Sequence, residues 1–203
     1  VLDNSKLETK MDVKLKTKTY GEIIVSTVFG GDTFIICNAR DFNLTIEPKN
    51  AKKFVEIAKE IIKIANQEFS FSHPTISSLD YISFCQFIEP VKVNSSQQKE
   101  GWNTVCIRPG KLDRSPCGTG TSARLALMKE KNEIDVNEVF ISRSIIGSTF
   151  ETKIKEEFFS NGKKMIKPLI KGSAFITGKQ ELYVSKNDPF PEGYRLNDTW
   201  PDF

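Results

Sequence analysis

The sequence predicts an α+β protein, and three observations support this fold class. Many short runs are rich in Val, Ile, Phe and Thr, which is typical of β-strands. Segment 48–65 has the apolar spacing of an amphipathic helix, and segment 121–127 is apolar on most sides, as buried helices are. Many short strands with one amphipathic and one apolar helix predict an α+β arrangement.

The composition is that of an ordinary globular protein. The 203 residues are 38% hydrophobic and 27% charged, which suffices for a real core in one large or two small domains. The net charge is only +3 and the lysines are scattered, so we expect no nucleic acid partner. No apolar run approaches the length of a membrane span, and residues 1–6 do not resemble a signal peptide.

The first part of the chain predicts strands that form a hairpin. Residues 13–17 alternate between apolar or β-branched residues and lysines, and the β-rich runs 23–28 and 33–37 surround the turn signal at Gly30 and Gly31. Plain turn chemistry explains these two glycines about as well as a role facing a ligand.

The predicted helix separates this hairpin from a second β region. Between residues 48 and 65, apolar residues recur every three or four positions while lysines and glutamates fill the other face, so we expect the helix to pack on a sheet. Strands are then predicted at 78–90 and 102–107, with an exposed polar loop at 93–101 between them.

The last third of the chain predicts further strands and a proline-rich tail. The strand-like runs are 139–142, 144–150, 153–159, 165–170 and 173–177. Asn161 and Gly162 are typical of a hairpin turn. On composition alone, the aromatic segment 188–201 could pass for a loose tail.

The four cysteines have neither zinc-ligand spacing nor the density of a disulfide framework, so a reducing, cytoplasmic setting is the default expectation. Cys37 and Cys106 fall in predicted strands and are expected in the interior, although a disulfide between Cys106 and Cys117 stays open. The single histidine, His73, precedes a proline in a predicted loop, which excludes a histidine-rich metal site.

The stretch DRSPCGTGTSAR, residues 113–124, is the strongest candidate site. Pro116 fixes the backbone before Cys117, and Gly118 and Gly120 allow the backbone to approach a ligand closely. A helix that begins here has amide N–H groups without intrahelical partners, and these groups favour negative charge. We therefore expect Cys117 to have a depressed pKa and the same amides to hold a carboxylate.

A simpler interpretation exists for each of these residues. A cysteine is more often a small buried hydrophobe than a reactive group, and Asp113 could serve only as a turn or cap residue. The spacing of Asp113 and Cys117, the two glycines and the threonine hydroxyls together favour a functional role.

Residues 113–123 resemble the second catalytic-cysteine motif of the proline racemase family, which includes 4-hydroxyproline epimerases. The resemblance runs from about Tyr20 to Trp200. It implies a diaminopimelate-epimerase-like fold, in which each of two halves is a curved, mostly antiparallel sheet around a central helix. The active site lies between the halves, and this chain corresponds to the second half.

The resemblance also implies a domain organisation. Residues 1–19 would be the end of the first-half domain or a linker, residues 20–170 the second catalytic domain, and residues 171–203 a C-terminal segment that packs back on the first-half domain. The family's other cysteine, which precedes Gly-His, has no counterpart in this sequence, and the chain begins with valine. We therefore expect a fragment or processed chain, completed by an N-terminal half in the same or a separate chain.

The activity implied is a cofactor-independent racemase or epimerase that inverts the α-carbon of proline or 4-hydroxyproline by two-thiol proton transfer. Cys117 would be one acid/base, the backbones of Gly118 and Thr119 would hold the substrate carboxylate, and Asp113 would pair with the ring nitrogen. The expected partner is a small-molecule imino acid, with no metal or pyridoxal phosphate and no membrane, and a homodimer stays open.

The substrate and two other function classes remain open. Tyr81 falls where the hydroxyproline branch is expected to carry histidine; it could donate a hydrogen bond to a substrate hydroxyl or only line a wall. Residues 193–201 are more similar to the hydroxyproline epimerase branch. The alternatives are a catalytically silent binding module that keeps the carboxylate cradle, and a diaminopimelate-epimerase-like enzyme.

Overall fold

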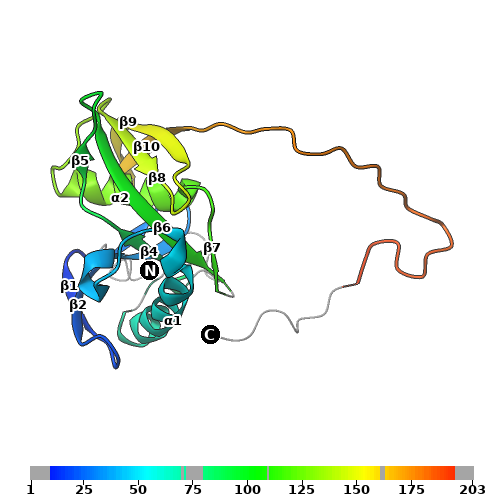
Figure 1. The fold of residues 1–203 in the computed structure, drawn as a ribbon, viewed down its shortest axis with the longest axis horizontal. Coiled ribbons are helices and arrows are strands. Elements are labelled where there is room, and N and C mark those ends of the chain that lie inside the picture. Colours follow the sequence, from blue (N-terminus) through cyan, green and yellow to red (C-terminus); the bar gives the residue numbers. More distant parts are fainter. Residues whose placement is uncertain (1–9, 70, 72–79, 109, 161–162, 195–203) are drawn as a thin grey trace.

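The computed structural model describes residues 10–69, 71, 80–108, 110–160 and 163–194 (Figure 1). Its strands form one curved, mixed sheet in the order β1-β2-β3-β4-β6-β8-β9-β10, and the short β5 and β7 pair with β6. The strands are β1 Val13–Lys16, β2 Glu22–Phe29, β3 Thr33–Asn38, β4 Phe84–Ile88, β5 Lys92–Val93, β6 Lys99–Ile107, β7 Lys111–Leu112, β8 Val139–Arg143, β9 Thr149–Ser160 and β10 Lys163–Lys171. The predicted α+β class and the mostly antiparallel sheet are confirmed: only β3–β4 and β6–β8 are parallel pairs among the described strands.

The predicted hairpin and amphipathic helix are both present. β2 and β3 pair antiparallel across the glycine turn, with Phe29 opposite Thr33. After a short 3-10 turn at Ala39–Phe42 and another at Pro48–Asn50, α1 (Ala51–Glu68) forms the crossover that makes β3 and β4 parallel neighbours. Helix and hairpin therefore follow directly from the apolar pattern of the sequence.

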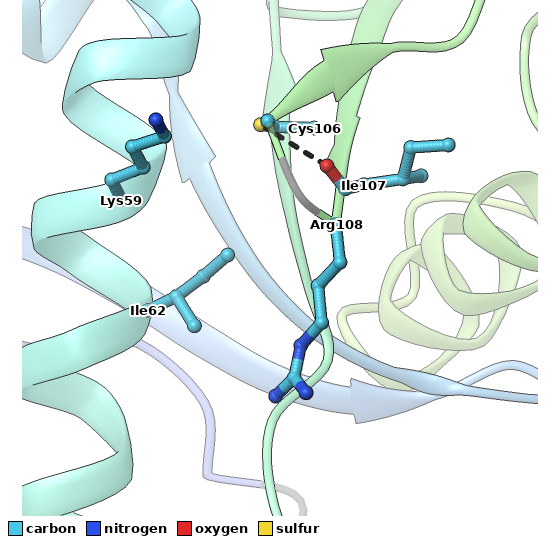
Figure 2. A pocket seen from close by; sticks show the side chains of 6 residues that line it. Lys59, Ile62, Cys106, Ile107 and Arg108 are labelled. Carbon is cyan, nitrogen blue, oxygen red and sulfur yellow. Dashed lines mark hydrogen bonds between the residues drawn. The ribbon is translucent and has the colours of Figure 1, made fainter. Parts of the chain in front are cut away.

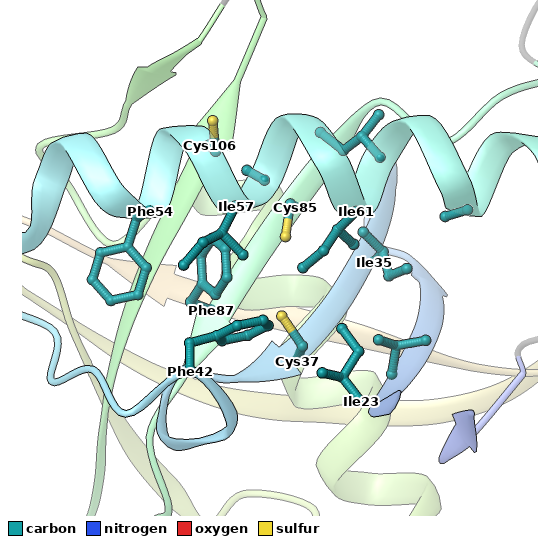
Figure 3. Packing of buried hydrophobic residues seen from close by; sticks show 14 of the residues in the cluster. Ile23, Ile35, Cys37, Phe42, Phe54, Ile57, Ile61, Cys85, Phe87 and Cys106 are labelled. Carbon is teal, nitrogen blue, oxygen red and sulfur yellow. The ribbon is translucent and has the colours of Figure 1, made fainter. Parts of the chain in front are cut away.

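Helix α1 covers one face of the sheet. Figure 3 shows Phe54, Ile57 and Ile61 on its inner side, packed toward the strand residues Ile35 and Phe87. The rings of Phe54 and Phe87 have centroids 4.8 Å apart. The expectation that this helix packs on a sheet is confirmed.

Helix α2 (Gly118–Glu130) lies on the other face, and the sheet curves around it from β2 and β3 to β10. It is buried on two sides: Ala123 and Leu127 belong to one apolar cluster with Phe34, whereas Leu125 and Met128 belong to another. Burial on both sides explains the apolar residues around its middle turns, and the helix also buries the polar side chains of Thr121 and Arg124. It begins three residues earlier than the predicted start at residue 121.

Two predicted elements in the middle of the chain are wrong in detail. Residues 93–101 are not one exposed loop, because β5 and the start of β6 pair in a hairpin with Lys92 opposite Glu100. Residues 144–148 form a turn rather than a strand, closed by a 2.9 Å hydrogen bond from Ser144 N to Ser148 O. Gly147 has φ +83° in this turn, which favours glycine over any residue with a Cβ.

The chain leaves the sheet after β10. Residues 172–194 have no strand, so the strand predicted at 173–177 is wrong, and Figure 1 shows this segment running away from the body of the molecule. Its side chains are exposed, with Ile176 98% accessible. His73, the turn at 161–162 and residues 195–203 lie outside the described residues. The proposed domain boundaries stay predictions. Strand β1, which lies inside the proposed segment 1–19, pairs with β2 of the proposed second domain.

Within the described residues, no helix is long and apolar enough to cross a membrane. The same part of the chain contains no group of three or more His, Cys, Asp or Glu side chains that could hold a metal ion.

Candidate functional site

Cys117 is the residue from which α2 begins. It has φ 63° and ψ 119°, and its side chain lies over the first turn of the helix. The Gly120 N–H donates to the Cys117 Sγ at 3.4 Å, and the Thr119 hydroxyl lies 3.5 Å from the same sulfur. The sulfur therefore occupies the position that an N-cap oxygen takes in other helices.

This backbone conformation is unusual for a residue with a Cβ. A positive φ at a non-glycine residue costs roughly 1–3 kcal/mol and persists only where the surroundings hold it. The Pro116 ring before it and the hydrogen bond from the Cys117 N–H to Ser115 Oγ at 3.2 Å restrict the approach to the helix. Such strain is concentrated at functional sites, which fits the predicted role of this residue.

The first turn of α2 is open on the side next to the cysteine. Gly118 and Thr119 are exposed, and a Cβ built on Gly118 would meet no atom within 4 Å. The first N–H groups of an α-helix have no intrahelical acceptor and carry the positive end of the helix dipole. A carboxylate can therefore approach this turn without a steric barrier from Gly118.

The turn between β2 and β3 forms the opposite wall of this helix end. A Cβ on Gly30 would lie 2.3 Å from the Thr119 carbonyl oxygen and 2.4 Å from the Ala123 nitrogen. Gly31 has φ +104°, and a Cβ on it would lie 3.1 Å from the Thr119 methyl carbon. The two glycines thus serve close helix packing, a role that the sequence interpretation missed because the contact joins distant parts of the chain.

Asp113 lies beside the cysteine, directly after β7. Its backbone N–H donates to the Val105 carbonyl at 3.0 Å, which ties it to the end of β6. Its carboxylate raises the pKa of the Cys117 thiol. The structure therefore brings Asp113, Cys117, Gly118 and Thr119 together at one helix end; the roles predicted for them stay predictions.

The predicted low pKa of Cys117 is wrong for this chain. The pKa of the Cys117 thiol is raised to about 11: burial raises it most, the Asp113 carboxylate also raises it, and the Thr119 hydroxyl and the Gly120 N–H lower it. The sulfur is enclosed by strands and only 7% of the residue is accessible. Desolvation of the thiolate outweighs the favourable helix N-terminus.

Tyr81 lies just before β4, at the end of the sheet where β3 also begins. Its carbonyl accepts a 2.7 Å hydrogen bond from the Thr33 hydroxyl, and its ring faces the Arg108 guanidinium at 4.4 Å. The strand order brings this residue to the same sheet end as the glycine turn. Its contact with a substrate hydroxyl stays a prediction.

The other three cysteines lie on the α1 side of the sheet. Cys37, Cys85 and Cys106 are buried and all four cysteines are free thiols, so the interior placement is confirmed and the disulfide between Cys106 and Cys117 is not formed. Figure 2 shows Cys106 at a small hollow between α1 and the end of β6, near Lys59. Burial raises the pKa of Cys106 to about 11 as well.

With this geometry in place, comparison with known families gives a clear match. A sequence model of the proline racemase family matches residues 4–195. The chain belongs to the proline racemase family.

Solved structures of proline racemase relatives agree. A hydroxyproline epimerase from Agrobacterium vitis, crystallised with trans-4-hydroxy-L-proline, has a TM-score of 0.78 and 30% identity over 94% of this chain and 54% of its own. A probable proline racemase from Agrobacterium radiobacter K84, with bound carbonate, has a TM-score of 0.76 and 31% identity over 94% of this chain and 55% of its own. The chain therefore spans about half the length of these relatives.

A more distant likeness supports the fold alone. A methylitaconate-delta-isomerase has a TM-score of 0.50 and 15% identity over 83% of this chain and 47% of its own. The diaminopimelate-epimerase-like fold expected from the proline racemase motif is confirmed by the two Agrobacterium structures.

Proposed function

We propose that this chain is the Cys117-bearing half of a cofactor-independent racemase or epimerase that inverts the α-carbon of proline or 4-hydroxyproline. The observation that carries this proposal is a cysteine held at the N-terminus of the central helix, with Asp113 beside it, in a chain of the proline racemase family. The hydroxyproline bound to one relative and the carbonate bound to another support a small carboxylate ligand.

The substrate carboxylate is proposed to bind the open first turn of α2. The backbone of Gly118 and Thr119 is exposed there, and the helix dipole favours an anion. When the α-proton leaves, negative charge spreads into this carboxylate, so N–H groups aimed at it stabilise the transition state more than the ground state.

The proton is proposed to move between Cys117 and the α-carbon. An opposing base removes the α-proton from one face, and the electron pair of the C–H bond delocalises into the carboxylate. The Cys117 S–H then donates its proton to the other face and becomes a thiolate, which the Gly120 N–H and Thr119 hydroxyl stabilise. A raised pKa keeps Cys117 protonated at neutral pH, as this donor role requires.

Asp113 is proposed to bind the ring nitrogen of the substrate. Its charge raises the pKa of the Cys117 thiol in the free chain. A substrate ammonium next to Asp113 would offset that charge, so substrate binding would lower the pKa of Cys117 and ease the donation of its proton to the α-carbon.

The opposing base and the covering domain are proposed to come from sequence outside these 203 residues, since the relatives are nearly twice as long. Residues 1–19 would connect to that half, residues 20–170 would form the domain with Cys117, and residues 171–203 would pack against the missing half. The described part of this tail exposes several large apolar side chains that such a contact would cover: Phe175, Ile176, Leu182, Tyr183, Val184, Phe190 and Tyr194.

The site itself can be tested on the isolated chain. Pyrrole-2-carboxylate has a planar α-carbon like that of the transition state, so it should slow alkylation of Cys117 by iodoacetamide, read by peptide mass spectrometry. Labelling of Cys106 is the matched control, because its pKa is also raised to about 11 but it lies across the sheet. Equal protection of both thiols, or of neither, would contradict a carboxylate site at α2.

The activity is tested by adding the other half of the enzyme. We expect Val1–Phe203 alone to be inactive on L-proline and trans-4-hydroxy-L-proline and prone to associate, and the N-terminal half supplied in trans to restore inversion and solubility together. Chiral chromatography of the products measures this. Cys117→Ser should abolish the restored turnover while Cys106→Ser should not. Robust turnover by the isolated chain would show that the two-thiol account is wrong.

A further inference from the structure

The backbone angles at Cys117 depend on the two peptide planes that flank it. The Pro116 carbonyl lies in the plane before the cysteine, and the Cys117 carbonyl lies in the plane after it. Holding both carbonyls in place therefore holds φ and ψ at 63° and 119°, a combination that a residue with a Cβ does not adopt without support.

One residue holds both carbonyls. The Thr121 hydroxyl donates to the Pro116 oxygen at 3.1 Å, and the Thr121 backbone N–H donates to the Cys117 oxygen at 2.9 Å. Thr121 is fully buried, so water does not compete for these bonds. The side chain and the main chain of one helical residue thus fix both planes around the cysteine.

Two further buried residues determine the direction of the Thr121 hydroxyl. The Ser142 hydroxyl lies 3.1 Å from it, and the Asn103 side-chain amide donates to Ser142 Oγ at 2.7 Å. Both residues are 0% accessible. Because Thr121 has a single hydroxyl proton and gives it to Pro116, Ser142 must donate to Thr121, and Asn103 supplies the donor that Ser142 then accepts.

The result is a one-way chain of hydrogen bonds from the sheet to the cysteine. It begins at Asn103 on β6, passes through Ser142 on the parallel neighbour β8, and ends at the peptide between Pro116 and Cys117. Each hydroxyl in it both donates and accepts, and such chains strengthen one another in a buried setting.

We propose that Thr121 is a positioning residue for Cys117, and that Asn103 and Ser142 keep its hydroxyl directed at the Pro116 carbonyl. These hydrogen bonds hold the strained backbone of Cys117, so that its sulfur stays over the first turn of α2 and accepts from the Gly120 N–H. The consequence for turnover rests on the proposed function of Cys117, whereas the position of the thiol does not.

The test replaces the hydroxyl and follows the thiol. Thr121→Val keeps the branched shape and removes the donor to Pro116, so the Cys117 backbone can relax and its sulfur can turn away from the helix. We expect iodoacetamide to label Cys117 about tenfold faster at pH 8 in the folded chain, an order of magnitude that corresponds to releasing one strained residue. Thr121→Ser keeps the donor and should label within about twofold of the unchanged chain.

Matched controls separate positioning from general loosening. Thr104→Val makes the same change at a buried threonine whose hydroxyl has no hydrogen-bond partner among the described residues, and should leave Cys117 labelling unchanged. Cys37, Cys85 and Cys106 lie across the sheet and report global opening. Ser142→Ala removes the hydrogen-bond donor to Thr121 without changing any residue of α2. It should accelerate the labelling of Cys117 alone, and by less than Thr121→Val does.

Two results would overturn the assignment. Equal acceleration at all four cysteines in Thr121→Val would show a general structural role. If Cys117 is labelled in Thr121→Val and in Ser142→Ala at the same rate as in Thr104→Val, the Thr121 hydroxyl does not hold the cysteine. Turnover of the unchanged chain mixed with its N-terminal half separates the two proposals. If Thr121→Val accelerates labelling of Cys117 but the unchanged mixture shows no turnover, the proposed function is contradicted and the positioning role is not.

Discussion

The two helices of this molecule are held in place by different kinds of contact. Helix α1 buries one apolar face on the sheet, with Phe54 and Ile61 fully covered, and leaves its lysines exposed to solvent. Helix α2 is enclosed on two sides and contains the fully buried polar residues Thr121 and Arg124. The first helix makes its polar contacts with the fold from side chains that are not buried, Glu60 and Asn66, whereas the second adds fully buried polar contacts to its apolar packing.

Arg124 shows the difference most clearly. Its guanidinium donates to the Trp102 carbonyl at 2.8 Å and the Glu89 carbonyl at 2.7 Å, and burial lowers its pKa to about 10. A Cβ on Gly101 would lie 2.3 Å from its Nη2, so β6 needs a residue without a side chain where the guanidinium packs. Together with Thr121, this contact fixes where α2 lies along the sheet.

The contrast teaches that stability and position are separate requirements in this fold. Apolar packing is non-directional and tolerates small shifts, whereas a hydrogen bond weakens steeply when its geometry changes. The helix that carries the candidate acid/base is the one with fully buried polar side chains and with a glycine, Gly30, packed against its backbone. The helix with no site residue is the one with an ordinary amphipathic pattern.

The largest expected effect is on stability and comes from α1. Phe54→Ala removes a fully buried ring that packs on Phe87, so we expect the free energy of unfolding to fall by about 4 kcal/mol. Urea denaturation followed by circular dichroism measures it. In the fraction that remains folded, protection of Cys117 by pyrrole-2-carboxylate should be unchanged. Loss of that protection would show that α1 also positions the site.

A smaller loss of stability with a larger loss of binding is expected from the glycine turn. Gly30→Ala places a methyl group 2.3 Å from the Thr119 carbonyl, so the first turn of α2 must shift, at a cost of about 2 kcal/mol. Ligand protection of Cys117 should disappear. Gly178→Ala, where a Cβ meets nothing within 4 Å, is the control for both readouts. Full protection in Gly30→Ala would mean that this turn does not support the carboxylate site.

The same contrast explains what the sequence could predict. Helix α1 and the β2–β3 hairpin were predictable because their apolar periods are local. The candidate site was predictable in its residues because 113–124 is one continuous motif. The wrong predictions are the exposed loop at 93–101 and the strands at 144–148 and 173–177, which lie in polar or short mixed stretches where local patterns are ambiguous.

Properties that depend on distant parts of the chain were not predictable. The contact of Gly30 with Thr119 and the bond of Ser142 to Thr121 join segments that lie far apart in sequence. The pKa of Cys117 was predicted in the wrong direction for the same reason: the helix N-terminus is local, but the burial that outweighs it comes from the surrounding strands.

The smallest expected effect tests whether Cys117 and Cys106, on opposite sides of the sheet, respond alike to pH. Burial raises the pKa of each thiol from 9.0 to about 11 in the folded chain. Between pH 9 and 11 the unfolded chain has released protons that the folded chain still holds, so the free energy of unfolding must fall as pH rises through this window, and not below it.

Each thiol should account for about 1 kcal/mol of the stability lost between pH 8 and pH 10. Cys117→Ala and Cys106→Ala should therefore each reduce the pH dependence of urea unfolding by a similar amount, because desolvation is the main cause at both sites. A much weaker effect at Cys117 would mean that the Gly120 N–H and Thr119 hydroxyl stabilise its thiolate more than burial destabilises it. The stabilisation of the thiolate by the helix N-terminus would then exceed its desolvation by the sheet. The two sides of the sheet would differ in how they stabilise a thiolate, as they differ in packing.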